Sequence, residues 1–383
     1  MNWLVERTKG DVIIWIIVLF LSLVSLLAVY SSTETMAYKL RGGNFEYYIF
    51  KHFFLMAFGL AMMYFAHKIN YKYYSRISQL AIVISGILLI ITLFFGGSVN
   101  QAHRWLTLPG INLSFQTSDL AKLALIMYTA RMLAKKQDVI DSFWKSTLPI
   151  MGASVIICFL ILPANLSTAA VVFATNLLLM FIGRMNWKHI TLIIIAGLFF
   201  LISGIYILHK IGGIGRVDTW VNRVENYFQG GEEKVFYQNQ QANIAIATGG
   251  VFGKGPGNSV QKNFLPNPYA DFIFAIIIEE YGLVGACILI FLYLLLLYRS
   301  IGIVLKSPRA FGALLAVGLA FSLVLQALIN MGVAVHLFPV TGLTLPLVSM
   351  GGTSLWFTSI AFGIILSVSR DIEEKENLDA IPA

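Results

Sequence analysis

Charged residues are scarce in this chain. Asp, Glu, Lys and Arg together make up 12% of its 383 residues, while 58% of the residues are hydrophobic. A soluble globular domain carries about 25% charged residues. The first apolar run, at 12–31, has the length of about 20 residues that a helix needs to cross a bilayer. The composition therefore excludes a soluble domain and predicts a membrane protein.

Several other features are missing. The chain has two cysteines, Cys158 and Cys287, and both lie in apolar runs, so no disulfide framework is expected. Its six histidines show no metal-ligand spacing. The first apolar run exceeds the core of a cleavable signal peptide, and no small-residue cleavage site follows it. The net charge of +8 comes without a groove-reading element, so no nucleic-acid partner is expected.

Ten apolar runs predict an all-α polytopic membrane protein with ten transmembrane helices, a single integral membrane domain over 1–383. The runs lie at 12–31, 49–66, 80–95, 120–133, 144–162, 166–182, 189–208, 272–297, 311–333 and 345–368. An even number of spans puts both termini on one side. Lys and Arg concentrate in the segments that share this side, which is typical of the cytoplasmic side of a membrane.

This topology places a large extracytoplasmic loop, 209–270, between helices 7 and 8, and a short cytoplasmic tail at 371–383. A connection of that length in a compact fold is usually functional. Its mixture of aromatic residues, glycines and charges predicts a folded cap, and the weakly amphipathic part at 239–252 could form a helix along the membrane surface. A second outer loop is expected at 96–118.

Asp271 lies where the large loop enters the eighth span. A carboxylate there could simply cap the helix and complement its dipole. An ionisable residue at the water–lipid boundary is also a functional candidate, and as a general base it would need neighbours that tune its pKa. From position alone the two interpretations are equally favoured.

Glu279 and Glu280 follow roughly 12–13 Å deeper along the same helix. Two adjacent acids at that depth are costly unless they are paired. On the fourth span, Asp119 and Lys122 share one helix face at i and i+3. The hypothesis is that Lys122 bridges toward the acids of the Asp271 helix, either as a structural ion pair or as part of a catalytic site.

The segment 253–262 is rich in glycine and lysine. Its glycines permit close backbone approach, and its positive charge suits an anionic headgroup. It does not match a nucleotide P-loop, because Thr248 stands where a glycine is needed and Gly255 follows Lys254. The alternative is a flexible basic turn. The candidate substrate-binding residues of this segment are Asn258, Ser259, Gln261 and Lys262.

Further candidates lie in the other outer segments. Arg104, beside Trp105, could bind phosphate or could be an interfacial belt residue, and Arg216 is a phosphate candidate of similarly low specificity. The stretch 339–354 has a density of Pro and Gly, including Pro346, that breaks helix geometry. Irregular backbone at membrane depth is tolerated where it lines a cavity or is buried in protein, so this stretch predicts a broken helix entering the tenth span.

These segments together resemble the SEDS family (shape, elongation, division and sporulation) of ten-span peptidoglycan polymerases over nearly the whole chain. The motifs that carry the resemblance are Arg104-Trp105-Leu106, the segments 115–122, 216–220, 249–253 and 253–282, Gly342-Leu343-Thr344-Leu345-Pro346, and Gly351-Gly352. The loop 257–262 and the segment 342–346 are more similar to the division branch, FtsW, than to the elongation branch, RodA.

The resemblance implies an inverting glycosyltransferase that acts on lipid II, an undecaprenyl-pyrophosphate disaccharide-pentapeptide. The family's essential aspartate falls on Asp271, which would deprotonate the acceptor 4-hydroxyl. Arg104, Lys122 and the glycine loop would hold pyrophosphate or tune Asp271, supported by Asp119, Glu279, Glu280 and Pro346. No residue set specifies a metal, although a divalent cation, Mg²⁺ or Mn²⁺, could assist the leaving group near Asp271.

The resemblance also implies a place and partners. These are the bacterial cytoplasmic (inner) membrane at the division septum, a class B penicillin-binding protein transpeptidase and other divisome membrane proteins. The chain departs from the family pattern at Thr117 and Asp119, at 163–167, at Val340-Thr341 and at Met350. The competing hypothesis is a transporter of the lipid-linked precursor, which would place charged residues near the bilayer midplane in repeated halves. The polar signature lies instead on one outer face without a repeat, which favours the enzyme over a transporter or a non-catalytic scaffold.

Overall fold

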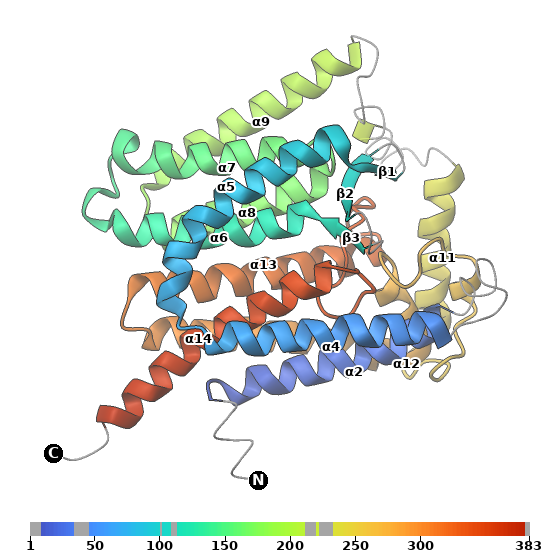
Figure 1. Ribbon diagram of the computed structural model, residues 1–383. Helices are drawn as coiled ribbons and strands as arrows, with labels where there is room; N and C mark the ends of the chain where they lie inside the picture. Colours follow the sequence, from blue (N-terminus) through green and yellow to red (C-terminus); the bar gives the residue numbers. More distant parts are fainter. Residues whose placement is uncertain are drawn as a thin grey trace. The chain divides into compact units, whose positions relative to one another are not determined.

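The computed structural model describes residues 9–33, 46–99, 102–108, 113–210, 220–221 and 233–379, and these are mostly helical (Figure 1). The predicted all-α class is confirmed. The helices are α2 (Val12–Ser32), α4 (Glu46–Lys68), α5 (Tyr71–Phe95), α6 (Thr117–Lys135), α7 (Leu148–Ile161), α8 (Leu166–Ile182), α9 (Trp187–Lys210), α11 (Glu233–Gly249), α12 (Ile273–Lys306), α13 (Ala310–Ala334) and α14 (Ser354–Asp379), with the short turns η1 (Gln137–Val139), η2 (Phe143–Thr147) and η3 (Gln261–Asn263).

Within the described residues, 8 helices are long and apolar enough to cross a membrane. They are α2, α4, α5, η2 with α7, α9, α12, α13 and α14. The remaining predicted spans coincide with α8, which has 17 residues, and with α6, whose 19 residues include Asp119, Lys122 and Arg131. The chain is a multi-pass helical membrane protein, and the count of ten spans stays a prediction.

The helices group into two compact units. Unit 1 comprises Met1–Ile69, Glu225–Ile303 and Leu323–Ala383, and unit 2 comprises Asn70–Val224 and Val304–Ser322. In unit 2, α5, α6, α7 and α8 lie side by side (Figure 1). Their shared core consists of Leu89, Ala121, Leu125, Ile157, Cys158, Ile161, Ala169 and Val172. In unit 1, α4 packs along α14 and also contacts α2.

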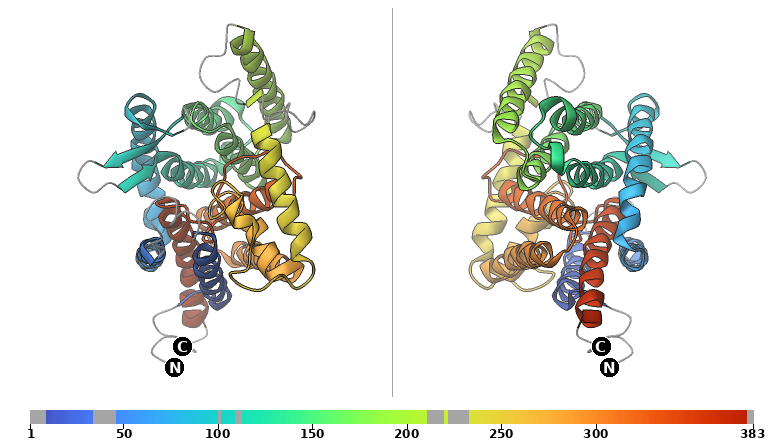
Figure 2. Two further views of the ribbon diagram at one scale, coloured as in Figure 1. Left: turned by 90° about the vertical axis from the view of Figure 1, so that its right-hand side faces the viewer. Right: turned by 90° about the vertical axis from the view of Figure 1, so that its left-hand side faces the viewer.

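A small antiparallel sheet in unit 2 was not expected from the sequence. Its order is β1 (Gly97–Val99), β2 (Ala102–Leu108) and β3 (Leu113–Gln116), and Trp105 pairs with Gln116. The strands occupy the predicted outer loop 96–118 and extend from the ends of α5 and α6 (Figure 2). The sheet is how the chain satisfies the backbone groups of this connection.

Several helix boundaries differ from the predicted ones. The third span is not short: α5 begins at Tyr71, because the Asn70 side chain accepts a hydrogen bond from the Lys72 amide and caps the helix. The surface helix expected at 239–252 is α11, which begins at Glu233. The span predicted from Leu345 is wrong at its start, since residues 335–353 are not helical and α14 begins at Ser354.

Helix α12 is interrupted at Gly282, which has φ 67° and ψ −168°. The Leu283 and Val284 amides do not bond to the carbonyls four residues earlier. They donate instead to the carbonyl oxygens of Gly250 (3.0 Å) and Val251 (3.2 Å). The carbonyl oxygens of Glu279 and Glu280 accept in turn from Lys254 N and Gly255 N, both at 2.9 Å. The loop after α11 thus exchanges hydrogen bonds with the broken helix.

This exchange needs glycine at the points of closest approach. A Cβ on Gly253 (φ +79°) would overlap the carbonyl of Glu280, and a Cβ on Gly282 would overlap the carbonyl of Val251. Gly257 has a similar φ of +81° but has open space around its Cβ position. Gly86 in α5 has neither constraint.

We expect Gly253→Ala to prevent the loop from docking on α12. Gly257→Ala should cost about 1–3 kcal/mol from backbone strain alone. Gly86→Ala should be neutral or slightly stabilising, because alanine has the higher helix propensity. Thermal unfolding of the three purified variants in detergent measures the order, and equal melting temperatures for Gly253→Ala and Gly257→Ala would contradict the steric argument.

Candidate functional site

Asp271 lies in a turn, two residues before the first helical residue of α12, and is half-buried. Its main chain is held from two other elements. The Asn330 side chain on α13 donates through Nδ2 to the Asp271 carbonyl at 3.0 Å. The Ser349 hydroxyl donates to the Ala270 carbonyl at 2.7 Å, and the Met350 amide donates to the Tyr269 carbonyl at 2.9 Å. The backbone that carries the carboxylate is therefore held in place.

The irregular segment 335–353 is the element that holds this turn. Its residues Leu345, Leu347, Val348 and Ser349 are buried, so the predicted interruption of the helix before the tenth span is present. Its carbonyl oxygens accept from side chains of neighbouring helices: Leu343 from Asn330 (2.6 Å), Thr344 from Gln326 (2.8 Å), Pro346 from Tyr293 (2.5 Å) and Val348 from Ser25 (2.8 Å).

The same segment approaches the Asp271 side chain. A Cβ placed on Gly342, where φ is +69°, would lie 3.9 Å from Asp271 Oδ2. The main chain at Gly342 therefore runs beside the carboxylate. Pro346, predicted as a supporting residue, is buried, and its carbonyl oxygen accepts from the Tyr293 hydroxyl.

Tyr269 is a neighbour of Asp271 that the sequence reasoning missed. Burial, and then the proximity of Tyr48 and of the Asp271 carboxylate, raise the pKa of the Tyr269 hydroxyl above its ordinary value. The hydroxyl donates to Asn267 Oδ1 at 3.0 Å. Tyr269 therefore remains a neutral hydrogen-bond donor at neutral pH. Asn330 was also missed, although a buried amide within an apolar run is a signal that could have indicated it.

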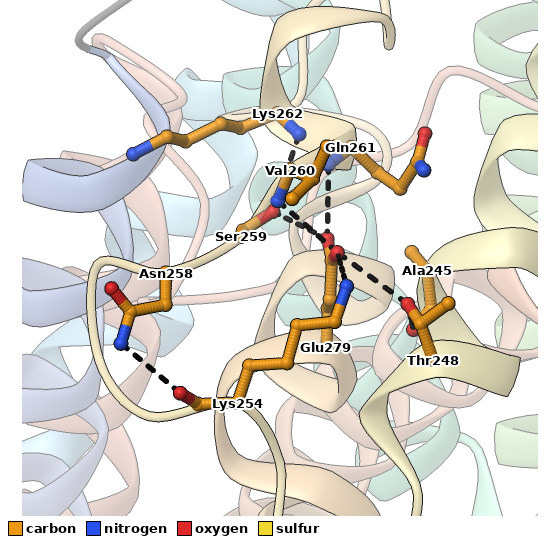
Figure 3. A network of polar contacts seen from close by, with 9 residues as sticks. All are labelled: Ala245, Thr248, Lys254, Asn258, Ser259, Val260, Gln261, Lys262 and Glu279. Carbon is orange, nitrogen blue, oxygen red and sulfur yellow. Dashed lines mark hydrogen bonds and ion pairs between the residues drawn. The ribbon is translucent and has the colours of Figure 1, made fainter.

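Glu279 is the centre of a network of polar contacts in unit 1 (Figure 3). Lys254 Nζ lies 2.6 Å from Glu279 Oε1, and the Ser259 hydroxyl donates to Oε2 at 2.5 Å. The amides of Val260 and Gln261 each donate at 3.1 Å, and the Thr248 hydroxyl lies at 3.5 Å. Within unit 1 the cation that Glu279 contacts is Lys254. Lys122 lies in unit 2, and its bridge toward the acids of the Asp271 helix stays a prediction.

The loop residues predicted to bind substrate divide into two groups. Ser259, Gln261 and Lys262 are buried, and their backbone or side chains bond within the loop and to Glu279. The Lys262 ammonium donates to the Gly257 carbonyl at 3.0 Å. Asn258 is exposed and donates to the Lys254 carbonyl at 3.0 Å. Binding of substrate by these four residues stays a prediction.

Glu280 has different surroundings from Glu279. It is buried, and its Oε1 accepts from the Ser31 hydroxyl at the end of α2. Its Oε2 has no hydrogen-bond partner within the part of the chain that the structure describes. Both acids thus lie against the glycine loop, since Glu280 is also close to the main chain of Gly257 and Ser259, and Glu280 alone of the two also contacts α2.

Arg104, Asp119 and Lys122 belong to unit 2. Arg104 on β2 donates through Nε to the Ala164 carbonyl at 2.8 Å and lines a small pocket with Gln116, Ser118 and Asn165. Lys122 Nζ lies 3.9 Å from Asp119 Oδ1, and both side chains are largely buried. The predicted i, i+3 pair on α6 is therefore present. Arg216 lies outside the described residues.

A divalent cation near Asp271 was left open by the sequence. In the described ranges no cluster of three or more His, Cys, Asp or Glu side chains could hold a metal ion. No set of metal ligands is therefore assigned beside Asp271 within the described residues.

Residues 11–374 match the family of cell cycle proteins that comprises FtsW, RodA and SpoVE. The chain belongs to this family. It is 34% identical over 371 residues to stage V sporulation protein E of Bacillus subtilis, covering 95% of this chain and 98% of that one. It is also 34% identical over 370 residues to the probable peptidoglycan glycosyltransferase FtsW of Coxiella burnetii, covering 94% and 96%.

Two solved structures are similar over nearly the whole length. One comes from a study of how a peptidoglycan synthase complex coordinates polymerization and crosslinking; it has a TM-score of 0.75 at 26% identity and covers 95% of this chain and 98% of that one. The other is the crystal structure of the rod shape determining protein RodA of Thermus thermophilus, with a TM-score of 0.68 at 26% identity, covering 97% and 99%. The fold resemblance to this family is confirmed.

The geometry around Asn330 predicts a local effect on the Asp271 turn. Asn330→Leu leaves the carbonyls of Asp271 and Leu343 without their donor, at a cost of about 1–3 kcal/mol. We expect a lower melting temperature and faster amide hydrogen exchange in residues 269–272. Exchange measured by mass spectrometry on the protein in detergent would test this.

A matched control is Asn176→Leu in α8. Asn176 is also fully buried and loses hydrogen bonds with Thr129 and Val172, but it belongs to unit 2. It should lower the melting temperature without a selective change in the Asp271 turn. Equal exchange in 269–272 for the two variants would show that Asn330 does not anchor the turn.

Proposed function

We propose that this protein is a peptidoglycan glycosyltransferase that polymerises lipid II, with Asp271 as its general base. The proposal rests on the names of its relatives and on one structural observation. A half-buried carboxylate lies at the entrance of an apolar helix, and its main chain is held by Asn330, Ser349 and Met350. A base held in this way can receive a proton from a hydroxyl brought to the membrane surface.

In the proposed reaction, Asp271 takes the proton of the acceptor sugar's 4-hydroxyl. The oxygen attacks the anomeric carbon of the donor with inversion, a new glycosidic bond forms, and the bond to the lipid pyrophosphate breaks. The Tyr269 hydroxyl, close to Asp271, would donate to a substrate oxygen once that oxygen replaces Asn267 Oδ1 as its acceptor. Arg104 and Lys122 remain proposed ligands of the pyrophosphate, because Arg binds phosphate bidentately and Lys as a point charge.

The division role is proposed because the chain is similar to FtsW of Coxiella burnetii. Its glycine loop and its Leu345-Pro346 motif also resemble the division branch. A class B penicillin-binding protein is the proposed partner, since the similar solved structure belongs to a complex that combines polymerization with crosslinking. We place the protein in the inner membrane at the septum, with both termini in the cytoplasm. There it would contact other divisome proteins. The elongation role of a RodA-type polymerase is the alternative within the family.

A transporter of the lipid-linked precursor is the second candidate function. The observation that favours it is the irregular segment 335–353, largely buried from Leu343 onward, because non-helical backbone at membrane depth often lines a path for polar groups. The polymerase is preferred because the Asp271 carboxylate lies in the turn before α12, and not within the apolar helix.

Asp271→Asn should reduce glycan polymerisation by at least about 10²-fold, because the amide keeps the shape of the side chain but cannot accept the proton. The assay is glycan chain formation from lipid II in proteoliposomes that contain the protein and its partner transpeptidase. Asp141→Asn, which removes an exposed carboxylate in unit 2, is the control and should polymerise as the wild type does.

Equal glycan production by Asp271→Asn and wild type would reject Asp271 as the base. Movement of labelled lipid II across the bilayer by both proteins, without polymerisation by either, would favour the transporter.

A further inference from the structure

The Glu279 carboxylate projects from α12 and is surrounded by donors of the glycine loop. Its side chain has no exposed surface, and its partners are a lysine ammonium, a hydroxyl and two consecutive backbone amides. An ammonium beside consecutive N–H groups is the donor set that commonly binds phosphate in loops. Here the acid of α12 occupies it, so these donors shape the loop and are not presented to an external anion (Figure 3).

The loop is attached to the same turn of α12 in two ways, through a side chain and through main-chain carbonyls. The side chain of Glu279 holds residues 254–261, and the carbonyl oxygens of Glu279 and Glu280 accept from the Lys254 and Gly255 amides. The helix break at Gly282 exposes those carbonyls to the loop. Burial of a carboxylate is costly unless charged and neutral donors compensate it, so removal of this carboxylate should release the loop.

The held part of the loop is close in sequence to Asp271. Gln261 is bound by Glu279, and Tyr269 and Ala270 are bound by Met350 and Ser349. The short stretch 262–268 between these two attachments has both of its ends held. Asp271 follows directly, and α12 then returns the chain to Glu279.

We propose that Glu279 is a positioning residue: it holds the glycine loop against α12 and thereby sets the position of Asp271. This role rests on the proposed function of Asp271. Glu279 does not contact the substrate in this proposal, and Lys254, Ser259 and the amides of 260–261 act as structural donors and not as pyrophosphate ligands.

The direct test is Glu279→Gln, which keeps the size of the side chain and removes its charge. Amide hydrogen exchange of residues 254–263 should rise at least about tenfold, while exchange of the α12 core, residues 285–300, stays as in wild type. In the polymerisation assay, kcat should fall by about 10- to 100-fold with little change in KM, because the base is displaced and not removed.

A double-mutant cycle separates the charge pair from the rest of the network. Glu279→Gln leaves Lys254 without its acid, and Lys254→Gln leaves a buried carboxylate without its cation. The double variant should lose less free energy of unfolding than the sum of the losses in the two single variants, because neither charge is then left unpaired. Additive losses would show that the pair does not couple.

Asp371→Asn is the matched control. Asp371 is buried on α14 in unit 1 and pairs with Lys375 at 3.5 Å, so this change also neutralises a buried acid beside a lysine. Loop exchange and kcat should equal those of wild type. A fall in kcat equal to that of Glu279→Gln would mean that general destabilisation, and not positioning, explains the loss.

The exchange measurement does not depend on activity, so the two proposals can fail separately. If Asp271→Asn polymerises like wild type while Glu279→Gln releases the loop, the assignment of the base fails and the attachment of the loop is supported. If Glu279→Gln leaves loop exchange and kcat unchanged, the positioning role is overturned. Tighter binding of inorganic pyrophosphate together with higher activity in Glu279→Gln would also overturn it, because the loop would then be an anion site that Glu279 blocks.

Discussion

The structure depends on one constraint: a backbone polar group in the membrane interior has no water to bond, so protein must supply its partner. Segment 335–353 is not helical and is largely buried from Leu343 onward, yet its carbonyl oxygens at Leu343, Thr344, Pro346 and Val348 all have side-chain donors. These donors lie on α13, α12 and α2. The irregular path is therefore tied to the polar side chains of three helices.

The turn of Asp271 is part of the same set of bonds. Ser349 accepts from the Leu345 amide and donates to the Ala270 carbonyl. The Asn330 side-chain amide donates to the carbonyls of both Leu343 and Asp271. A change in the irregular segment would therefore reach the Asp271 turn through the hydrogen bonds of Ser349 and Asn330 to main-chain groups. This explains why Asp271 can lie outside the regular helix and still have a defined position.

The break in α12 follows the same constraint in a different way. Gly282 interrupts the helical ladder, and the loop after α11 supplies both the donors and the acceptors that the helix loses. The buried carboxylate of Glu279, next to this break, receives its hydrogen bonds from the same loop. A glycine-rich loop that would look like a phosphate site in isolation is thus used internally, as a partner of the helix.

Much of this architecture was readable from the sequence. The apolar runs predicted the helices, because a spanning helix must be apolar along its length, and the Pro- and Gly-rich stretch predicted the interruption before α14. The i, i+3 spacing predicted the Asp119–Lys122 pair, since that contact is local to one helix. The three-stranded sheet and the early start of α5 were missed, because both depend on short polar segments whose pairing and capping carry weak sequence signals.

The sequence by itself determined the membrane class, the family and the place of Asp271 at the entrance of α12, because these follow from local composition and order along the chain. Only the tertiary structure decided which cation Glu279 contacts and which groups hold the Asp271 turn. Lys254 and Glu279 are 25 residues apart, and Ser349 is 79 residues from Ala270. Contacts over such separations arise from packing and the need to satisfy buried polar groups, which no local pattern encodes.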